Sequence, residues 1–121
     1  NVEANNQKYA AEMEILARCV EAEAGNQSID VKRAVIAVIM NRVDDDAWPN
    51  TISEVIEEPY EFATYWNGAM DEAEPSVSTY EAISLEMETR FYPGLFYFDM
   101  NSYLPYGTPY ARMGDLYFST K

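Results

Sequence analysis

The stretch Val20-Glu21-Ala22-Glu23-Ala24-Gly25-Asn26-Gln27 lies where a long amphipathic segment ends and a more apolar segment begins. When residues 5–24 are placed on a helix at about 100° per residue, their apolar side chains form one narrow stripe. The stripe comprises Tyr9, Met13, Leu16 and Val20. Glu23 is the next residue on this stripe. Glu14 and Glu21 project from the other side of the helix, and we expect Glu21→Gln to keep near wild-type activity.

Glu23 is therefore expected to point toward the apolar side at the helix end, with Gly25 as the C-cap. A carboxylate beside apolar walls loses hydration, so its pKa rises. A glutamic acid that stays protonated for this reason can act as a general acid. The alternative interpretation is that Glu23 sits at a frayed, solvated helix end, because a perturbed carboxylate only favours a functional role.

Composition excludes several classes of partner. The chain has 121 residues, which suits a single domain over residues 1–121, and 48% of them are hydrophobic, enough for a core. No apolar run approaches the ~20 residues of a membrane span. The net charge of −13 argues against nucleic acid and anionic lipid, since both need a basic surface. No signal peptide is visible, and since the chain begins with Asn1 we expect a fragment from which targeting information has been removed.

The chain contains no histidine, which excludes Ser-His-Asp and Cys-His nucleophiles and histidine metal sites. The single cysteine, Cys19, lies near the apolar side of the first helix. We expect it to be a core residue rather than a nucleophile, because no base is available to activate it. The acidic triplet at residues 44–46 lacks the spaced ligands of a calcium loop, so we favour a solvated turn over a Ca²⁺ site. We expect no metal, no cofactor and a monomer.

Three further helices are predicted. The helix over residues 28–43 is capped by Ser28 and is apolar nearly all round, so we expect it to be the most buried element. A short helix follows a capping box that starts at Thr51, with Ile52, Val55 and Ile56 inward. A second capping box at Ser78 predicts a helix over residues 78–90, with Ala82, Ile83, Leu85 and Met87 partly inward.

Aromatic content predicts two strands, over residues 95–98 and 116–119, which we expect to pair with each other. The remaining segments are interpreted as a loose lead-in at 1–4, a long and partly structured loop at 59–77, and a loop rich in Tyr, Pro and Gly at 100–113. Long loops in compact domains often carry function.

Several of these segments together resemble a known family. They are Glu23-Ala24-Gly25-Asn26, Val38-Ile39-Met40-Asn41-Arg42-Val43, Trp48-Pro49-Asn50-Thr51-Ile52-Ser53-Glu54-Val55-Ile56, Glu61-Phe62-Ala63, Leu95-Phe96-Tyr97-Phe98 and Gly114-Asp115-Leu116-Tyr117-Phe118. In this order and spacing they resemble the SleB/CwlJ-type cell wall hydrolases, which include the spore-cortex-lytic enzymes. The resemblance covers roughly residues 12–119, and its most specific part is the Asn-Arg-Val segment followed by Pro-Asn-Thr-Ile.

The resemblance implies an α+β fold, a predominantly helical lysozyme-like domain with a short antiparallel β element near the C-terminus. It implies cleavage of peptidoglycan glycan strands between N-acetylmuramic acid and N-acetylglucosamine by a lytic transglycosylase route. The family's catalytic glutamate, the first residue of its Glu-Ala-x-Gly motif, falls on Glu23. An extracellular enzyme of the wall or spore, or a phage-encoded enzyme that acts on the wall, is the implied setting.

The chain departs from the family pattern in three places. Gly25 and Asn26 stand where the family usually has Arg and Gly, and Leu116 stands where it usually has His. The stretch between Phe62 and Tyr80 is also divergent. The first two departures lie next to the expected site, so the resemblance leaves substrate preference and the level of activity open.

The lytic route needs only one acid, whereas a two-carboxylate glycosidase needs a second acid about 5–10 Å away. Aromatic side chains suit the apolar faces of sugar rings, so we expect substrate contacts from one set of residues: Phe62, Tyr65, Trp66, Tyr97, Asn101, Tyr103 and Tyr117. Two alternatives stay open. One is a hydrolytic muramidase in which Asp99 or another acid assists a water, and the other is a degenerate domain that binds glycan or protein without catalysis.

Overall fold

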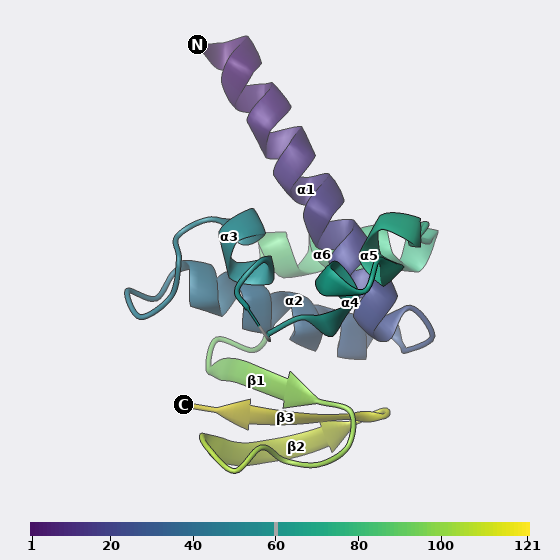
Figure 1. The fold of residues 1–121 in the computed structure, drawn as a ribbon, viewed down its shortest axis with the longest axis vertical. Helices are drawn as coiled ribbons and strands as arrows, with labels where there is room; N and C mark the ends of the chain where they lie inside the picture. The colour runs from purple at the N-terminus through teal and green to yellow at the C-terminus, as the bar shows by residue number, and fades with distance from the viewer. Residues whose placement is uncertain (60) are drawn as a thin grey trace.

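The computed structural model describes residues 1–59 and 61–121. Its elements are α1 (Val2–Ala24), α2 (Ile29–Val43), α3 (Ile52–Ile56), α4 (Ala63–Trp66), α5 (Ala69–Glu72), α6 (Val77–Glu88), β1 (Leu95–Asp99), β2 (Thr108–Met113) and β3 (Leu116–Thr120). The helices form one body and the sheet lies against α2 on the side opposite α1's free end (Figure 1). This confirms the predicted helical α+β domain with a small antiparallel sheet near the C-terminus.

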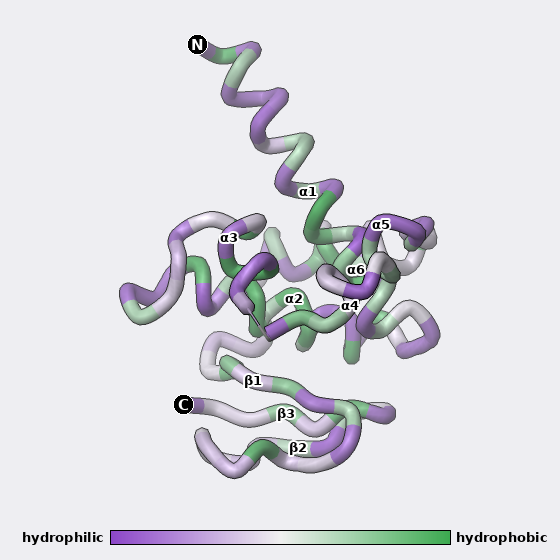
Figure 2. The backbone as a smooth tube through the Cα atoms, viewed as in Figure 1, coloured by the Kyte–Doolittle hydropathy of each residue, from purple (hydrophilic) through white to green (hydrophobic). Residues whose placement is uncertain are grey.

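Helix α2 forms the centre of the fold, as its apolar sequence predicts. Ten of its 15 residues are buried, and the run from Ala34 to Ile39 is completely inaccessible. Ser28 caps the helix, since its side chain accepts a hydrogen bond from the Val31 amide. In Figure 2 the hydrophobic residues gather on α2 and on the part of α1 that approaches it. Among the described residues, no helix has the length and apolar character that a membrane crossing requires.

Helix α1 is longer than predicted. It begins at Val2, where the Asn1 side chain accepts from the Ala4 amide, so the prediction of a loose lead-in at 1–4 was wrong. Its first turns project from the body as an exposed helix (Figure 1), and burial begins around Leu16. Gly25 does cap the helix but keeps a right-handed conformation at φ −57°. A Cβ there would lie 2.5 Å from the Glu21 carbonyl oxygen, so the position requires a glycine because space is short.

The middle of the chain holds more helix than predicted. The capping box at Thr51 and the inward face of α3 are confirmed. The segment interpreted as a loop over 59–77 contains α4 and α5, and its residue 60 lies outside the described residues. Helix α6 starts at Val77, one residue earlier than predicted, because Ser76 rather than Ser78 caps it and accepts the Thr79 amide. Ala82 and Ile83 are buried as predicted, whereas Leu85 is 37% exposed.

The sheet has the strand order β1-β3-β2, and both neighbouring pairs are antiparallel. The predicted pairing of β1 with β3 is confirmed, but β2 was missed inside the segment predicted as a loop. The Asn-Arg segment at the end of α2 attaches the sheet to the helices. The Asn41 amide group donates to the carbonyls of Tyr92 and Leu95, and Arg42 Nε donates to the carbonyl of Phe96.

Candidate active site

A cleft of about 500 Å³ opens between the helices and the sheet, with Glu23 in its wall. The remaining lining comes from α2, the segment leading into α4, β1, the loop after β1, and the start of β3. These residues are Arg42, Glu61, Phe62, Ala63, Thr64, Asn67, Phe98, Asp99, Met100, Asn101, Leu104, Tyr106 and Leu116. Several of them are apolar, so the cleft offers Glu23 an environment of reduced hydration.

Glu23 lies in the last turn of α1 and is partly buried, four residues after the fully buried Cys19. Burial raises the pKa of the Glu23 carboxyl, and a hydrogen bond from Thr64 offsets part of this rise. The Thr64 hydroxyl donates to Glu23 Oε1 at 3.0 Å. The Glu23 carboxyl is therefore partly buried and held inside the cleft by a hydrogen bond, and the alternative of a frayed, solvated side chain is wrong.

The other charged groups in the cleft are already engaged. Arg42, only 4% exposed, donates from Nη1 to a Glu61 carboxylate oxygen at 3.1 Å. The Asp99 carboxylate accepts backbone N–H groups from Asn101 at 2.8 Å and Ser102 at 3.2 Å. Asp99 thus stabilises the turn that follows β1, and Glu61 is neutralised by a buried guanidinium.

A contact joins the loop between α1 and α2 to the hairpin β2–β3. Gln27 Nε2 donates to the Asp115 carboxylate at 2.9 Å, and the Asp115 amide donates to Gln27 Oε1 at 3.2 Å. The hairpin turn uses Gly114 at φ +57°, where a Cβ would lie 2.2 Å from Gln27 Oε1. This reciprocal pair links the loop after Glu23 to the strand that carries Leu116 into the cleft.

Glu21 has a structural environment that the sequence did not reveal. Its Oε1 accepts the Ser76 amide at 2.9 Å and the Thr79 hydroxyl at 2.7 Å. Burial alone would raise the pKa of Glu21, but these hydrogen bonds and the nearby Lys32 charge together lower it. Lys32 is itself buried and donates to Ser78 Oγ at 2.7 Å. These contacts give Glu21 a structural role that the helical stripe did not predict, and the expectation that Glu21→Gln keeps near wild-type activity stays a prediction.

The predicted substrate contacts divide into three groups. Phe62 and Asn101 line the cleft with Glu23. Trp66, which is 61% exposed, lines a neighbouring recess of about 650 Å³ together with Pro59. This recess adjoins the cleft, because Ala63 and Asn67 line both cavities. Tyr65 packs edge-on against Trp66 at a centroid distance of 5.0 Å.

The remaining predicted contacts, Tyr97, Tyr103 and Tyr117, are not among the cleft-lining residues. Tyr97 packs against Tyr106, with ring centroids 5.1 Å apart, and Tyr103 packs against Tyr117 at the same distance. The structure therefore brings these three side chains next to the cleft rather than into it.

Sequence reasoning missed several residues that line the cleft, among them Thr64, Arg42 and Tyr106. Arg42 could have been found from the Asn-Arg-Val segment that carries the family resemblance. Thr64 has no local signal, because its partner Glu23 is 41 residues away. Tyr106 lies in a loop whose composition predicted only irregular structure.

The other candidate groups, Cys19 and the acidic triplet at residues 44–46, are not among the cleft-lining residues. Cys19 is a buried free thiol, as predicted, and burial followed by the Glu23 charge raises the pKa of this thiol. In the acidic triplet, Asp44 pairs with Arg90 and Asp45 pairs with Lys121. Within residues 1–59 and 61–121, no group of three or more Cys, Asp or Glu side chains is arranged to hold a metal ion.

Comparisons with known proteins concern the sequence family and the fold of the chain. Residues 26–118 match the family described as Cell Wall Hydrolase, a match that begins three residues after Glu23. The catalytic domain of the germination-specific lytic transglycosylase SleB from Bacillus anthracis has a similar fold, with a TM-score of 0.76 and 22% identity over 90% of this chain and 93% of that chain. The catalytic domain of the Bacillus cereus SleB protein gives a TM-score of 0.74 and 20% identity, covering 90% of this chain and 89% of that chain. A comparison with curated protein sequences finds no significant match.

Proposed function

Since the chain belongs to the cell wall hydrolase family and is an enzyme that acts on peptidoglycan, we propose that it cleaves the glycan strand between N-acetylmuramic acid and N-acetylglucosamine by a lytic transglycosylase reaction. Glu23 is the acid and base of this reaction. We further expect the enzyme to act outside the cell on the wall or spore, and to do so as a monomer.

In the first half of the proposed reaction, protonated Glu23 donates its proton to the glycosidic oxygen as the bond to the muramic acid carbon breaks. The raised pKa of Glu23 supports this step, because a buried carboxyl retains its proton where a solvated one would lose it. The Thr64 hydroxyl donates to Oε1, which leaves Oε2 as the oxygen that carries the proton.

In the second half, the Glu23 carboxylate accepts a proton from the C6 hydroxyl of the same muramic acid residue. The freed oxygen attacks the sugar's own anomeric carbon and closes a 1,6-anhydro ring. Glu23 ends the cycle protonated, so no water is consumed and no second catalytic carboxylate is needed. The apolar lining from Phe62, Phe98 and Leu116 favours this route because it limits access of competing water.

One observation carries the choice of the lytic route. Glu61 is paired with Arg42, and Asp99 is hydrogen-bonded to two backbone amides, so both other carboxylates of the described cleft have structural partners. A hydrolytic muramidase would require one of them to activate a water or to form a covalent intermediate. Glu23 is the cleft carboxyl whose pKa is raised by burial.

The test is mass spectrometry of fragments released from purified peptidoglycan, because a 1,6-anhydro end is one water lighter than a hydrolysed end. We expect anhydro ends from the wild type. Glu61→Gln and Asp99→Asn keep acceptor oxygens for Arg42 and for the turn amides, and each should retain its rate within about 10-fold, short of the 10²–10⁴ that acid–base catalysis provides. Hydrolysed ends together with a large loss in Asp99→Asn would favour the muramidase. Binding of the glycan without release of any fragment would favour the degenerate domain.

A further inference from the structure

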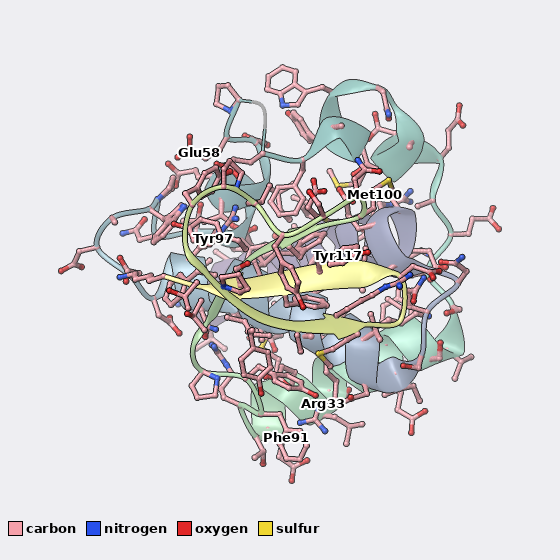
Figure 3. The ribbon with its side chains drawn as sticks, turned by 90° about the horizontal axis from the view of Figure 1, so that it is seen from below. Arg33, Glu58, Phe91, Tyr97, Met100 and Tyr117 are labelled. Atoms are coloured by element: carbon pink, nitrogen blue, oxygen red, sulfur yellow. The ribbon has the colours of Figure 1, made fainter. Side chains whose placement is uncertain are left out.

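The loop over residues 100–107, which joins β1 to β2, has two sides. Met100, Asn101, Leu104 and Tyr106 line the cleft that contains Glu23. Tyr103 instead packs edge-on against Tyr117 of β3, at a centroid distance of 5.1 Å and an interplanar angle of 78°. Figure 3 shows Tyr97, Met100 and Tyr117 together on the face of the sheet around this loop. The loop therefore links the cleft to the tyrosine-bearing face of the sheet.

Two exposed tyrosines of this loop are each supported by a tyrosine of the sheet. Tyr103 is 36% exposed and rests on Tyr117, and Tyr106 is 52% exposed and rests on Tyr97 at 81° and 5.1 Å. The guanidinium of Arg112 lies 5.2 Å from the centre of the Tyr117 ring. In both pairs a half-buried ring fixes an exposed one, so the exposed rings are held in place before any ligand arrives.

The backbone of the loop is also fixed at both ends. At its start, the Asp99 carboxylate accepts the amides of Asn101 and Ser102. At its end, Gly107 adopts φ +73°, and a Cβ there would lie 2.5 Å from the Thr120 carbonyl oxygen and 2.9 Å from the Tyr97 ring. The close approach of the loop to the sheet therefore requires a glycine at residue 107, next to Tyr106.

We propose that Tyr106 and Tyr103 form a glycan-binding platform that continues the cleft across the sheet, so that the enzyme engages sugars of the strand beyond those at the cleavage point. This inference rests on the proposed function, because the occupant is the same strand that Glu23 cleaves. Continuity with the cleft selects the strand as occupant: Tyr106 lines the cleft, and Tyr103 lies three residues away on the same loop. An exposed tyrosine offers an apolar ring to a sugar face and a hydroxyl to its polar edge.

The platform predicts a preference for long strands over short fragments. The test compares kcat/KM on purified glycan strands with kcat/KM on a tetrasaccharide fragment for the wild type, Tyr103→Ala and Tyr103→Phe. We expect Tyr103→Ala to reduce the long-to-short preference about 3- to 10-fold, the size of one aromatic contact, and Tyr103→Phe to retain it. The matched control is Phe91→Ala, which removes a 61% exposed ring that packs edge-on against Tyr92 outside the cleft.

A second readout does not depend on catalysis. In the inactive Glu23→Gln background, co-sedimentation with insoluble peptidoglycan measures strand binding directly, and Tyr103→Ala should weaken it by a similar factor while Phe91→Ala does not. If the wild type cleaves both substrates and Tyr103→Ala leaves the preference and the co-sedimentation unchanged, the platform is refuted and the proposed function stands. If the wild type cleaves neither substrate, the proposed function fails, and co-sedimentation alone decides whether the platform binds glycan.

Discussion

Glu23→Gln is the substitution that most directly tests the proposed chemistry. Glutamine keeps the shape of the side chain and an oxygen that can accept the Thr64 hydroxyl, the hydrogen bond observed at 3.0 Å. It has no proton that it can donate to a leaving sugar oxygen. The substitution therefore removes the acid while it preserves the cleft.

The expected loss of rate is about 10²–10⁴-fold, the usual contribution of a positioned general acid or base. The pH profile should change as well. Because burial raises the pKa of Glu23, the wild-type rate should fall as the pH rises through that raised pKa, since the acid is then ionised. The residual rate of Glu23→Gln should lack this limb. Fragment release followed by mass spectrometry at a series of pH values measures both effects.

The same pKa shift makes a prediction about folding stability. A carboxyl whose pKa is higher in the folded than in the unfolded protein binds its proton more tightly when folded, so stability falls as the pH rises from the unfolded value to the folded one. Glutamine does not titrate. Glu23→Gln should therefore match the wild type below about pH 4, near the ordinary pKa of a solvated glutamate, and become the more stable protein as the pH rises. Thermal or urea unfolding across this range measures the difference.

The matched control is Glu81→Gln, which removes the same charge from an exposed position on α6. It should alter neither the rate nor the pH dependence of stability. A Glu23→Gln enzyme that released anhydro fragments within 10-fold of the wild-type rate would refute the catalytic assignment. A stability difference that did not grow with pH would refute the claim that residue 23 is held as an acid.

Three further predictions follow from contacts outside the reacting group. Glu21→Gln should lower the free energy of unfolding by about 1–3 kcal/mol at pH 7, because the Ser76 amide and Thr79 hydroxyl lose a charged acceptor. Since the pKa of Glu21 is lowered in the folded protein, this difference from the wild type should vanish as the pH falls through that lowered pKa. Gly114→Ala should cost about 1–2 kcal/mol in thermal unfolding, since alanine disfavours φ +57° and its Cβ would displace Gln27. The cleavage rate should rise between ~10 mM and ~200 mM salt, because salt screens repulsion between an anionic wall and a protein of net charge −13; a rate that falls over this range would indicate a local basic contact such as Arg112.

The parts of the fold that could be predicted are those with a local signal. Ser28 and Thr51 accept the amides of residues three positions on, so a short pattern is enough to locate both helix starts. The apolar stripe of α1 predicted the side of the helix on which Glu23 lies, because side chains recur along a helix with a fixed period. Helix α2 is apolar nearly all round, and a helix of this kind is buried.

The parts that could not be predicted depend on distant partners or on very short elements. Strand β2 exposes most of its residues and contains Pro109, so neither alternation nor apolar content marks it as a strand. Helices α4 and α5 have four residues each, too few to show a period. The buried charge of Glu86 is compensated by Arg33, 53 residues earlier in the chain, and no local pattern predicts such a pair.

Glu21 and Glu23 show why the side of a helix matters more than the residue type. The two glutamates are separated by one residue on α1, yet the pKa of one is lowered and that of the other is raised. Glu21 faces the start of α6, where an amide, a hydroxyl and the Lys32 charge stabilise the carboxylate, so it stays ionised and holds α6 in place. Glu23 faces the cleft, where Thr64 is its hydrogen-bond partner among the described residues and burial favours the protonated form. The stable anion at residue 21 fixes the last turn of α1 against α6, and that turn carries the acid at residue 23 into the cleft.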